Sequence, residues 1–516
     1  MSKKEFRHKA KKTKETKKIT NQEKFFSFVF QKQQRIDLLI IGGICLAGYI
    51  VLKLCYPFPA TMSDSGGYVV SAQNNLFSFY RPFGYSCFLR IIHFFSSSVH
   101  AVFAVQMLLY AASIAFFALS VKYFFRPTHH KVIWYALLVF LTFNPMAFFM
   151  ANAIMSDMLF AVLIFAVLTT FIFVVMRKNW IAFGLFSLFL FFTLHIRYSA
   201  FVFPFIFIPF VLNIKGALKW VSLVVLPLLF LIFYGQIKSE MKKTTGFNQY
   251  STGFDGWQLA NNALHIVPHI DLSAAAIKNP SIRDLHAFVD NYKAVILENT
   301  GNGKSVSASF LWANNLPLKQ YLQKTMQERN LTYPYTWIYL GSGVYKDYGW
   351  YIIRHYPVEF MKYYFLPNTS NMFYTSFAGI MGSYAVIDGK DIINWYNIKD
   401  TKNLDSKYDL YGKFLSKIIS ISYGIVWIFI LCIGLYAFRK RKNIRFGKEE
   451  KILFWAFFTF GAIYYSSTIF ASPIELRYWL PMSVIRFSFM YILLHKLQDS
   501  ILPTVTRNNE QKRVPA

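Results

Sequence analysis

The sequence predicts an all-α polytopic membrane protein, and three observations carry that prediction. The 516 residues are 55% hydrophobic and 19% aromatic but only 16% charged, whereas a soluble globular chain carries about 25% charged residues. The apolar residues gather in stretches of about 17–25 residues, which is the length that crosses a bilayer. The basic residues, which give a formal net charge of +30, gather between alternate stretches. These features exclude a disordered, fibrous or small disulfide-stabilised protein and argue against a soluble enzyme.

The apolar stretches predict about ten transmembrane helices, within a range of about ten to twelve. They occupy residues 38–55, 99–125, 132–150, 158–176, 180–195, 200–212, 218–234, 417–438, 452–471 and 479–494. Two further apolar segments, 85–95 and 373–387, are short and could be re-entrant or interfacial.

The distribution of lysine and arginine predicts the orientation. With ten spans both termini lie on one side, and the basic clusters all fall on that side. They occupy the tail 1–36, the loops 126–131, 177–178, 215–219 and 439–445, and the tail 496–516. The positive-inside rule makes this side the cytoplasm. We expect the tail 1–36 to be disordered and to be attracted to anionic membrane lipids, not to nucleic acid.

The spans divide the chain into five parts. The basic tail 1–36 precedes an N-terminal transmembrane module at 37–234, which includes an outer loop at 56–100. A polar extracytoplasmic domain of mixed helix and loop is predicted at 235–416, between the seventh and eighth spans. The C-terminal transmembrane helices occupy 417–495, and the second cytoplasmic tail occupies 496–516. The four cysteines form no CxxC pair, so neither a disulfide framework nor a cysteine metal site is expected.

Two acidic residues are predicted to face outward at span ends. Asp64 follows the first span, and a carboxylate there could take a proton from a hydroxyl group or hold a metal. The alternative is that Asp64 caps a surface helix that begins at Gly66. Asp157 opens the fourth span after the helix break at Asn144-Pro145, and an ionisable residue at such a place is a functional candidate. Its alternative role is to complement the positive end of a helix.

Outward arginines beside spans are unusual under the positive-inside rule. Arg197 and Arg477 lie at the outer ends of the fifth and tenth spans, Arg354 lies on a predicted surface helix at 349–365, and Arg81 lies in the first outer loop. Arginine binds phosphate through two parallel hydrogen bonds. The alternatives are anchoring at the membrane interface, pairing of Arg477 with Glu475, and a capping role for Arg81.

In their order and sidedness these residues resemble the type C membrane glycosyltransferases. The resemblance is to protein O-mannosyltransferases, the lipid A aminoarabinose transferase and the rhizobial lipopolysaccharide galacturonosyltransferase-like group, and it covers residues 38–234 and the final spans. Its motif elements are Ser63-Asp64-Ser65-Gly66-Gly67-Tyr68, Arg81-Pro82-Phe83-Gly84-Tyr85, Asn144-Pro145 with Ser156-Asp157, Arg197-Tyr198, and Arg477-Tyr478-Trp479-Leu480-Pro481. The segment 235–416 has no detailed match.

The resemblance implies a transferase of the bacterial inner membrane that moves a sugar from a polyprenyl-phosphate donor, with inversion, on the outer face. The acceptor would be a glycan, a lipid or a protein. Asp64 would be the general base, and Asp157 would shape the site or hold a cation. The resemblance implies no certain cofactor, and a divalent cation could bind at these two carboxylates. The donor phosphate would bind Arg197, Arg477, Arg81 and Arg354, and the sugar or acceptor would contact Tyr68, Tyr85, Tyr198 and Tyr478.

Three other functions compete with this interpretation. A polysaccharide polymerase or ligase has many spans and a large outer loop, but its key arginines are expected in that loop. A transporter or flippase of lipid-linked sugars predicts charged residues near mid-membrane and paired interrupted spans, and the sequence has few of either. A membrane scaffold without enzymatic activity is the third.

Overall fold

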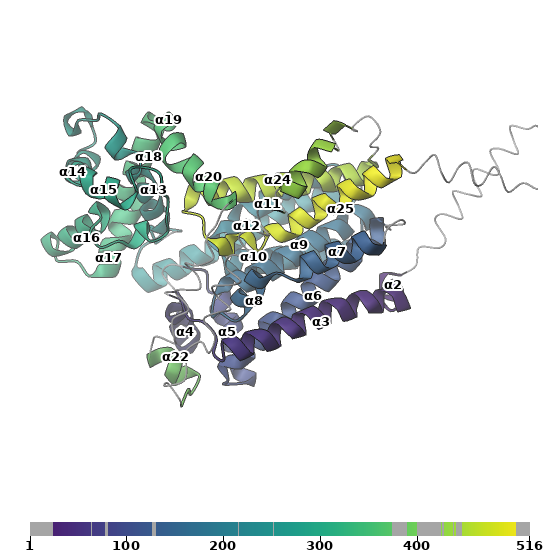
Figure 1. The fold of residues 1–516 in the computed structure, drawn as a ribbon. Coiled ribbons are helices and arrows are strands. Elements are labelled where there is room, and N and C mark those ends of the chain that lie inside the picture. Colours follow the sequence, from purple (N-terminus) through teal and green to yellow (C-terminus); the bar gives the residue numbers. More distant parts are fainter. Residues whose placement is uncertain are drawn as a thin grey trace, which may run out of the picture.

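The structure is a computed structural model that describes residues 24–501 with several gaps. The gaps are residues 63, 78–80, 126–130, 215, 251, 374–389, 400–424, 426–427, 437 and 440–445. The described residues form helices and contain no strand; one isolated bridge joins Ala60 to Ala153. A bundle of long apolar helices makes up one part of the molecule, and a group of short helices stands at one end of it (Figure 1).

The bundle is built from helices in the first half of the chain and near its C-terminal end. Its long members are α3 (Lys32–Cys55), α6 (Val99–Phe125), α9 (Ser156–Arg177), α12 (Ala217–Thr245), α24 (Lys448–Ala471) and α25 (Met482–Ile501). Shorter members are α7 (Lys131–Thr142), α8 (Pro145–Ala151), α10 (Trp180–Ile196), η1 (Tyr198–Val202) and α11 (Phe203–Val211). Helix α9 lies at the centre, since it contacts α6, α8, α10 and α24 and nearly all its side chains are buried.

Among the residues that the structure describes, six helices are long and apolar enough to cross a membrane, which is consistent with an all-α membrane protein. They are Lys32–Cys55, Val99–Phe125, Lys131–Ala151, Ser156–Arg177, Ala217–Thr245 and Lys448–Ala471. The predicted spans at 180–195 and 200–212 are apolar helices of lesser length. The predicted span 479–494 corresponds to η7 (Leu476–Trp479) and α25. Half of the predicted segment 417–438 falls outside the described residues, and its residues 428–436 are helical; nearly all of 373–387 falls outside them. The count of ten stays a prediction.

At two places the helices extend past a predicted boundary. The disordered tail was expected to reach residue 36, but α2 (Phe25–Val29) and α3 begin before that. Phe25 packs edge-to-face against Tyr123 and Phe173, so aromatic contacts order this end of the tail. The outer domain was expected to begin at residue 235, yet α12 continues without a break to Thr245.

Three helices lie beside the end of the bundle at which the short helices stand. They are α4 (Ser65–Asn74), α5 (Gly84–Phe95) and α22 (Lys390–Trp395). The apolar segment predicted as re-entrant or interfacial corresponds to α5, which is amphipathic and exposes Phe94 and Phe95. His93 of α5 stacks on Trp395, whose ring centroid is 4.3 Å away, so α22 is held against this group.

The short helices form a second cluster with its own buried core. They are α13 (Phe254–Leu264), α14 (Pro280–Asp290), α15 (Lys293–Asn299), η4 (Phe310–Trp312), α16 (Pro317–Glu328), α17 (Tyr333–Tyr339), the π-helical turn η5 (Leu340–Tyr345), α18 (Lys346–His355), α19 (Pro357–Phe360), η6 (Met361–Phe365) and α20 (Leu366–Phe373). The backbones of α13 and η5 touch, because a Cβ atom on Gly256 would lie 1.8 Å from the carbonyl oxygen of Gly341. The predicted surface helix 349–365 is broken at Pro357, and its first part packs on α13.

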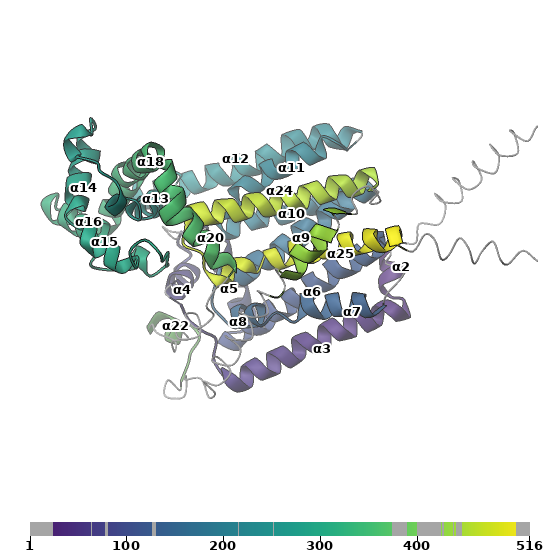
Figure 2. The ribbon, with the colours of Figure 1, turned by 45° about the horizontal axis from the view of Figure 1, so that its top comes forward.

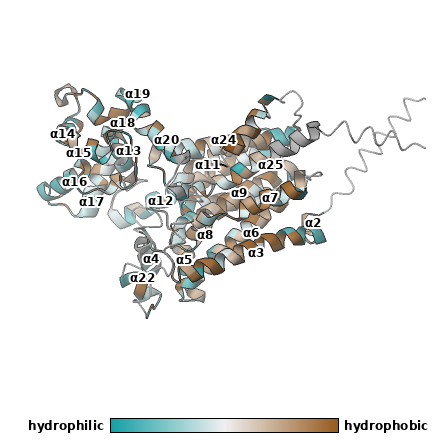
Figure 3. Cartoon of the chain, viewed as in Figure 1, coloured by the Kyte–Doolittle hydropathy of each residue, from teal (hydrophilic) through white to brown (hydrophobic). Residues whose placement is uncertain are grey.

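The two parts differ in polarity and in their position along the bundle axis. Hydrophobic residues dominate the bundle, and hydrophilic residues cover much of the short-helix cluster (Figure 3). In both ribbon views α2 and the last residues of α25 lie at the end of the bundle that faces away from this cluster (Figure 2). Lys178, directly after α9, pairs with Glu449 in the first turn of α24 at 2.8 Å. The two helices therefore run in opposite directions, and the first turn of α9 lies beside the end of α24, at the end of the bundle next to the cluster.

Candidate functional site

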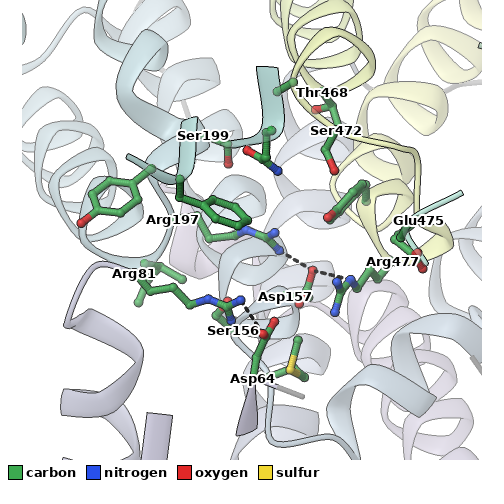
Figure 4. A pocket seen from close by; sticks show the side chains of 18 of the residues that line it. Asp64, Arg81, Ser156, Asp157, Arg197, Ser199, Thr468, Ser472, Glu475 and Arg477 are labelled. Atoms are coloured by element: carbon green, nitrogen blue, oxygen red, sulfur yellow. Dashed lines mark hydrogen bonds and ion pairs between the residues drawn. The ribbon is translucent and has the colours of Figure 1, made fainter. Parts of the chain in front are cut away.

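A cavity of about 310 Å³ lies where the cluster end of the bundle meets the short helices. Its wall combines the loop before α4, the start of α9, the junction of α10 with η1, the end of α24 with η7, and residues of α13 and η4. Segments that are hundreds of residues apart in the sequence therefore build one site (Figure 4).

Asp64 reaches the cavity because the loop before it is tied to the segment before α9. The Ala60 N–H donates to the carbonyl of Asn152 at 2.7 Å, and the Ile154 N–H donates to the carbonyl of Ala60 at 3.0 Å. The Ser65 hydroxyl adds a bond of 2.8 Å to the carbonyl of Ile154. Asp64 precedes α4, but its side chain makes no capping bond there. The capping role considered from sequence is thus not what its carboxylate does.

The carboxylate of Asp64 instead pairs with Arg81 at 2.5 Å, and both side chains are partly exposed to the cavity. Arg81 also donates to the Tyr68 hydroxyl at 3.1 Å, and its guanidinium lies 5.1 Å from the centre of the Tyr68 ring. The Tyr68 hydroxyl donates in turn to Ser156 at 2.8 Å. A continuous polar chain therefore links Asp64 to Ser156, the residue that precedes Asp157. Figure 4 shows Arg81 beside Asp64.

Asp157 lies in the first turn of α9, and its side chain is only 3% exposed. It forms an ion pair with Arg197, and Nε of Arg477 lies 4.0 Å from the same carboxylate oxygen. A buried carboxylate between two guanidiniums is stabilised by charge and not merely by the helix N-terminus. The three residues come from three separate elements, which their charges hold together.

The two arginines also rest on aromatic rings. The guanidinium of Arg197 lies 5.3 Å and that of Arg477 lies 5.5 Å from the ring centre of Tyr478. Arg197 lies 5.6 Å from Phe160 as well. Cation–π contacts of this kind stabilise a partly desolvated guanidinium and fix its plane. The Nε atom of Arg477 is buried and makes no hydrogen bond in the described part of the chain.

Glu475 is a third acidic residue at the cavity, and sequence reasoning considered it only as a partner for Arg477. The structure forms no ion pair between them among the described residues. Burial raises the pKa of Glu475, the charge of Asp157 raises it further, and Arg477 opposes the shift. The guanidiniums of Arg81, Arg197 and Arg477 all line the cavity and attract an added anion.

Two of the sequence-predicted residues lie away from the cavity. Arg354 is exposed on α18, where its guanidinium is 4.9 Å from the ring centre of Trp350. Tyr85 is fully buried, donates to Gln106 at 3.2 Å, and packs edge-to-face on Tyr68. Neither residue lines the cavity, so Arg354 can act there only after a movement and Tyr85 only through Tyr68. The other predicted residues line it: Asp64, Tyr68, Arg81, Asp157, Arg197, Tyr198, Arg477 and Tyr478.

The sequence did not indicate two parts of the wall. One is the last turns of α24 and the residue that follows it, which carry the hydroxyl groups of Ser467, Thr468 and Ser472. The other part comes from the short-helix cluster and includes Phe254 and Trp312. No local pattern predicts which face of that cluster meets the bundle.

The described residues do not gather a set of ligands for a divalent cation. No group of three or more His, Cys, Asp or Glu side chains in the described ranges could hold a metal ion. Asp64 and Asp157 are each paired with arginine, which competes with a cation for the carboxylate oxygens. We therefore derive no step through a metal. Comparisons with family models, with curated proteins and with solved structures return no match for this chain, so the site is interpreted from its own residues.

Proposed function

We propose that the protein is a glycosyltransferase that moves a sugar from a polyprenyl-phosphate donor to a glycan, lipid or protein acceptor. One observation carries the proposal. A single cavity at the end of an apolar helix bundle combines a solvent-accessible carboxylate, Asp64, with three guanidiniums, those of Arg81, Arg197 and Arg477. The lipid chain anchors the donor in the bilayer, so the donor phosphate can reach only a site near the membrane surface, such as the end of this bundle.

The donor phosphate fits between Arg197 and Arg477. Both guanidiniums face the cavity around Asp157, and Figure 4 shows them between Asp64 on one side and the α24 hydroxyl groups on the other. Negative charge grows on the phosphate as its bond to the sugar breaks, and guanidiniums already in place stabilise that charge without reorganisation. Asp157 holds the two like charges together when no phosphate is bound.

Asp64 is the general base in this mechanism. Its side chain is 22% exposed, against 3% for Asp157, and it has one arginine partner, whereas Asp157 has two. The acceptor hydroxyl oxygen attacks the anomeric carbon while the bond from that carbon to the phosphate oxygen breaks. The hydroxyl proton passes to Asp64, and the bonding electrons leave with the phosphate. A single displacement of this kind inverts the configuration at the anomeric carbon.

The proposed location is the bacterial inner membrane, with both termini in the cytoplasm and the cavity on the outer face. The first described residues, Lys24 onward, and the basic loop at 177–178 lie at the bundle end that faces away from the short-helix cluster. Basic segments favour the cytoplasmic side. The charges of the cavity then belong to the outer side.

Replacement of Asp64 by asparagine tests the assignment. We expect Asp64→Asn to lower the rate of sugar transfer about 10²–10⁴-fold, because the amide cannot take the acceptor proton. The assay uses purified protein, polyprenyl-phosphate sugars and an envelope extract as acceptor. Glu475→Gln is the matched control, since Glu475 lines the same cavity but has no role as a base here, and it is expected to keep most of the activity. Normal transfer by Asp64→Asn would contradict the base assignment.

A further inference from the structure

An aromatic ridge in the short-helix cluster forms part of the cavity wall. The ring of Trp312 lies parallel to that of Trp337, with 6.2 Å between centroids and 8° between planes, and Phe254 stacks on Trp312 at 6.1 Å and 19°. Trp257 is buried behind them, 4.8 Å from Trp337. The front of the ridge, Trp312 and Phe254, lines the cavity.

Trp312 is held in place although its side chain is 48% exposed. It ends the short helix η4, whose other residues Phe310 and Leu311 are buried, and its carbonyl accepts a hydrogen bond from Lys319 at 3.2 Å. Exposing the apolar face of an indole to a polar cavity costs free energy. Fixed aromatic faces with a few polar groups nearby are typical of small-ligand sites.

The polar groups around the ridge can bind hydroxyl groups. The Gln258 amide lines the cavity and makes no hydrogen bond with any described residue. The hydroxyls of Thr468 and Ser472 each donate to a backbone carbonyl, at 2.6 and 3.2 Å, which leaves their oxygens as acceptors. Figure 4 shows these two hydroxyls on the side of the arginines away from Asp64.

We propose that Trp312, Phe254 and Gln258 form a subsite for a saccharide ring. A sugar ring has an apolar face of C–H groups, which matches the indole, and an edge of hydroxyl groups, which matches the amide and the α24 oxygens. A polyprenyl chain does not match, because this wall carries polar groups and belongs to the short-helix cluster. The link to transfer rests on the proposed function, and the ring could come from the donor or from a glycan acceptor.

Saturation-transfer NMR on the full-length protein tests the subsite without any transfer reaction. The probes are methyl glycosides of glucose, galactose and mannose, and the detergent must carry no sugar headgroup. Ring C–H protons should be saturated, and Trp312→Ala should raise the Kd roughly 2- to 10-fold, with partial recovery in Trp312→Phe. Trp220→Ala is the matched control, because Trp220 is 64% exposed on α12, outside the cavity.

Two results would overturn the subsite: no saturation of any glycoside, or equal Kd values for wild type and Trp312→Ala. Binding that depends on Trp312 would stand even if Asp64→Asn transferred sugar normally, so the two proposals fail separately. Transfer kinetics then identify the source of the ring. A higher KM for the donor in Trp312→Ala indicates the donor sugar, and a higher KM for the acceptor indicates a glycan acceptor.

Discussion

Asp157 is the residue on which the charged part of the cavity depends. Its carboxylate is buried and shared between Arg197 and Arg477, which come from the α10–η1 junction and from η7. Two guanidiniums on one carboxylate are tolerated only while that carboxylate is ionised, since they otherwise repel each other. The residue thus stabilises the fold and prepares the cavity for an anion.

We expect Asp157→Asn to lower the free energy of unfolding by about 3–5 kcal/mol, because it breaks a buried ion pair and leaves both arginines uncompensated. Thermal unfolding in detergent measures the change. Glu449→Gln removes a partly exposed pair with Lys178 and should cost less than about 1 kcal/mol. Equal losses in the two variants would show that Asp157 has no special structural role.

At the residue scale the sequence predicted most of the charged site for a physical reason. An outward arginine or carboxylate beside a span is rare enough to stand out, and Asp64, Asp157, Arg197 and Arg477 were found in this way. Arg354 satisfied the same criterion but lies on the exposed side of α18. The side of the membrane on which a residue is predicted to lie does not reveal which face of its helix the residue occupies.

At the element scale, two asparagines join the short-helix cluster to the end of α24. Asn368 is fully buried, donates to the carbonyls of Ile469 and Ser472, both at 2.9 Å, and accepts from the Ile474 N–H at 2.8 Å. Asn262 donates to the carbonyl of Phe470 at 2.8 Å. These bonds satisfy carbonyls that the last turn of a helix leaves without partners. They also fix the chain that leads to Arg477.

We expect Asn368→Ala to lower kcat/KM for the donor at least about tenfold, because a misplaced Arg477 loses its contact with the phosphate. The variant should also lose about 1–3 kcal/mol of stability from the unpaired carbonyls. Kinetics are measured well below its unfolding midpoint. Asn291→Ala is the control, since exposed Asn291 bonds only within its own helix. A stability loss with unchanged donor kinetics would reduce Asn368 to a purely structural role.

Element boundaries were predictable where hydropathy changes abruptly. The prediction 99–125 coincides with α6, and 180–195 falls one residue short of α10. The extension of α12 to Thr245 was missed because its last turns are polar and hydropathy no longer marks the helix. The aromatic ridge that includes Trp312 meets the bundle through a tertiary contact. No periodicity in the sequence predicts that contact.

At the scale of the whole molecule, the arrangement places the cavity and the first described residues at opposite ends of one bundle (Figure 1). Cysteine labelling tests whether a membrane separates these ends. In a chain whose four native cysteines are replaced by serine or alanine, Lys278→Cys, on the exposed surface of the short-helix cluster, should react with an impermeant maleimide in intact cells. Lys24→Cys should react only after the membrane is permeabilised.

Labelling of both positions from outside would contradict the proposed orientation, and labelling of Lys24→Cys alone would reverse it. Substitution of a residue within the bundle, such as Ala118→Cys, gives the background level, because Ala118 is fully buried. The result is independent of any activity. It therefore separates the topology from the proposed chemistry.

The two short apolar helices next to the cavity have a consequence for the surrounding lipid. Helix α10 has 17 residues, or about 26 Å at 1.5 Å per residue, and Tyr198–Val211 is shorter still. The hydrocarbon core of a bilayer is about 30 Å thick, so the membrane is expected to thin against these helices. Ile196 to Ser199, where the two helices meet, line the cavity. This local thinning of the membrane would bring the lipid headgroups closer to Arg197. The phosphate of a membrane-anchored donor would then move a shorter distance to reach the cavity.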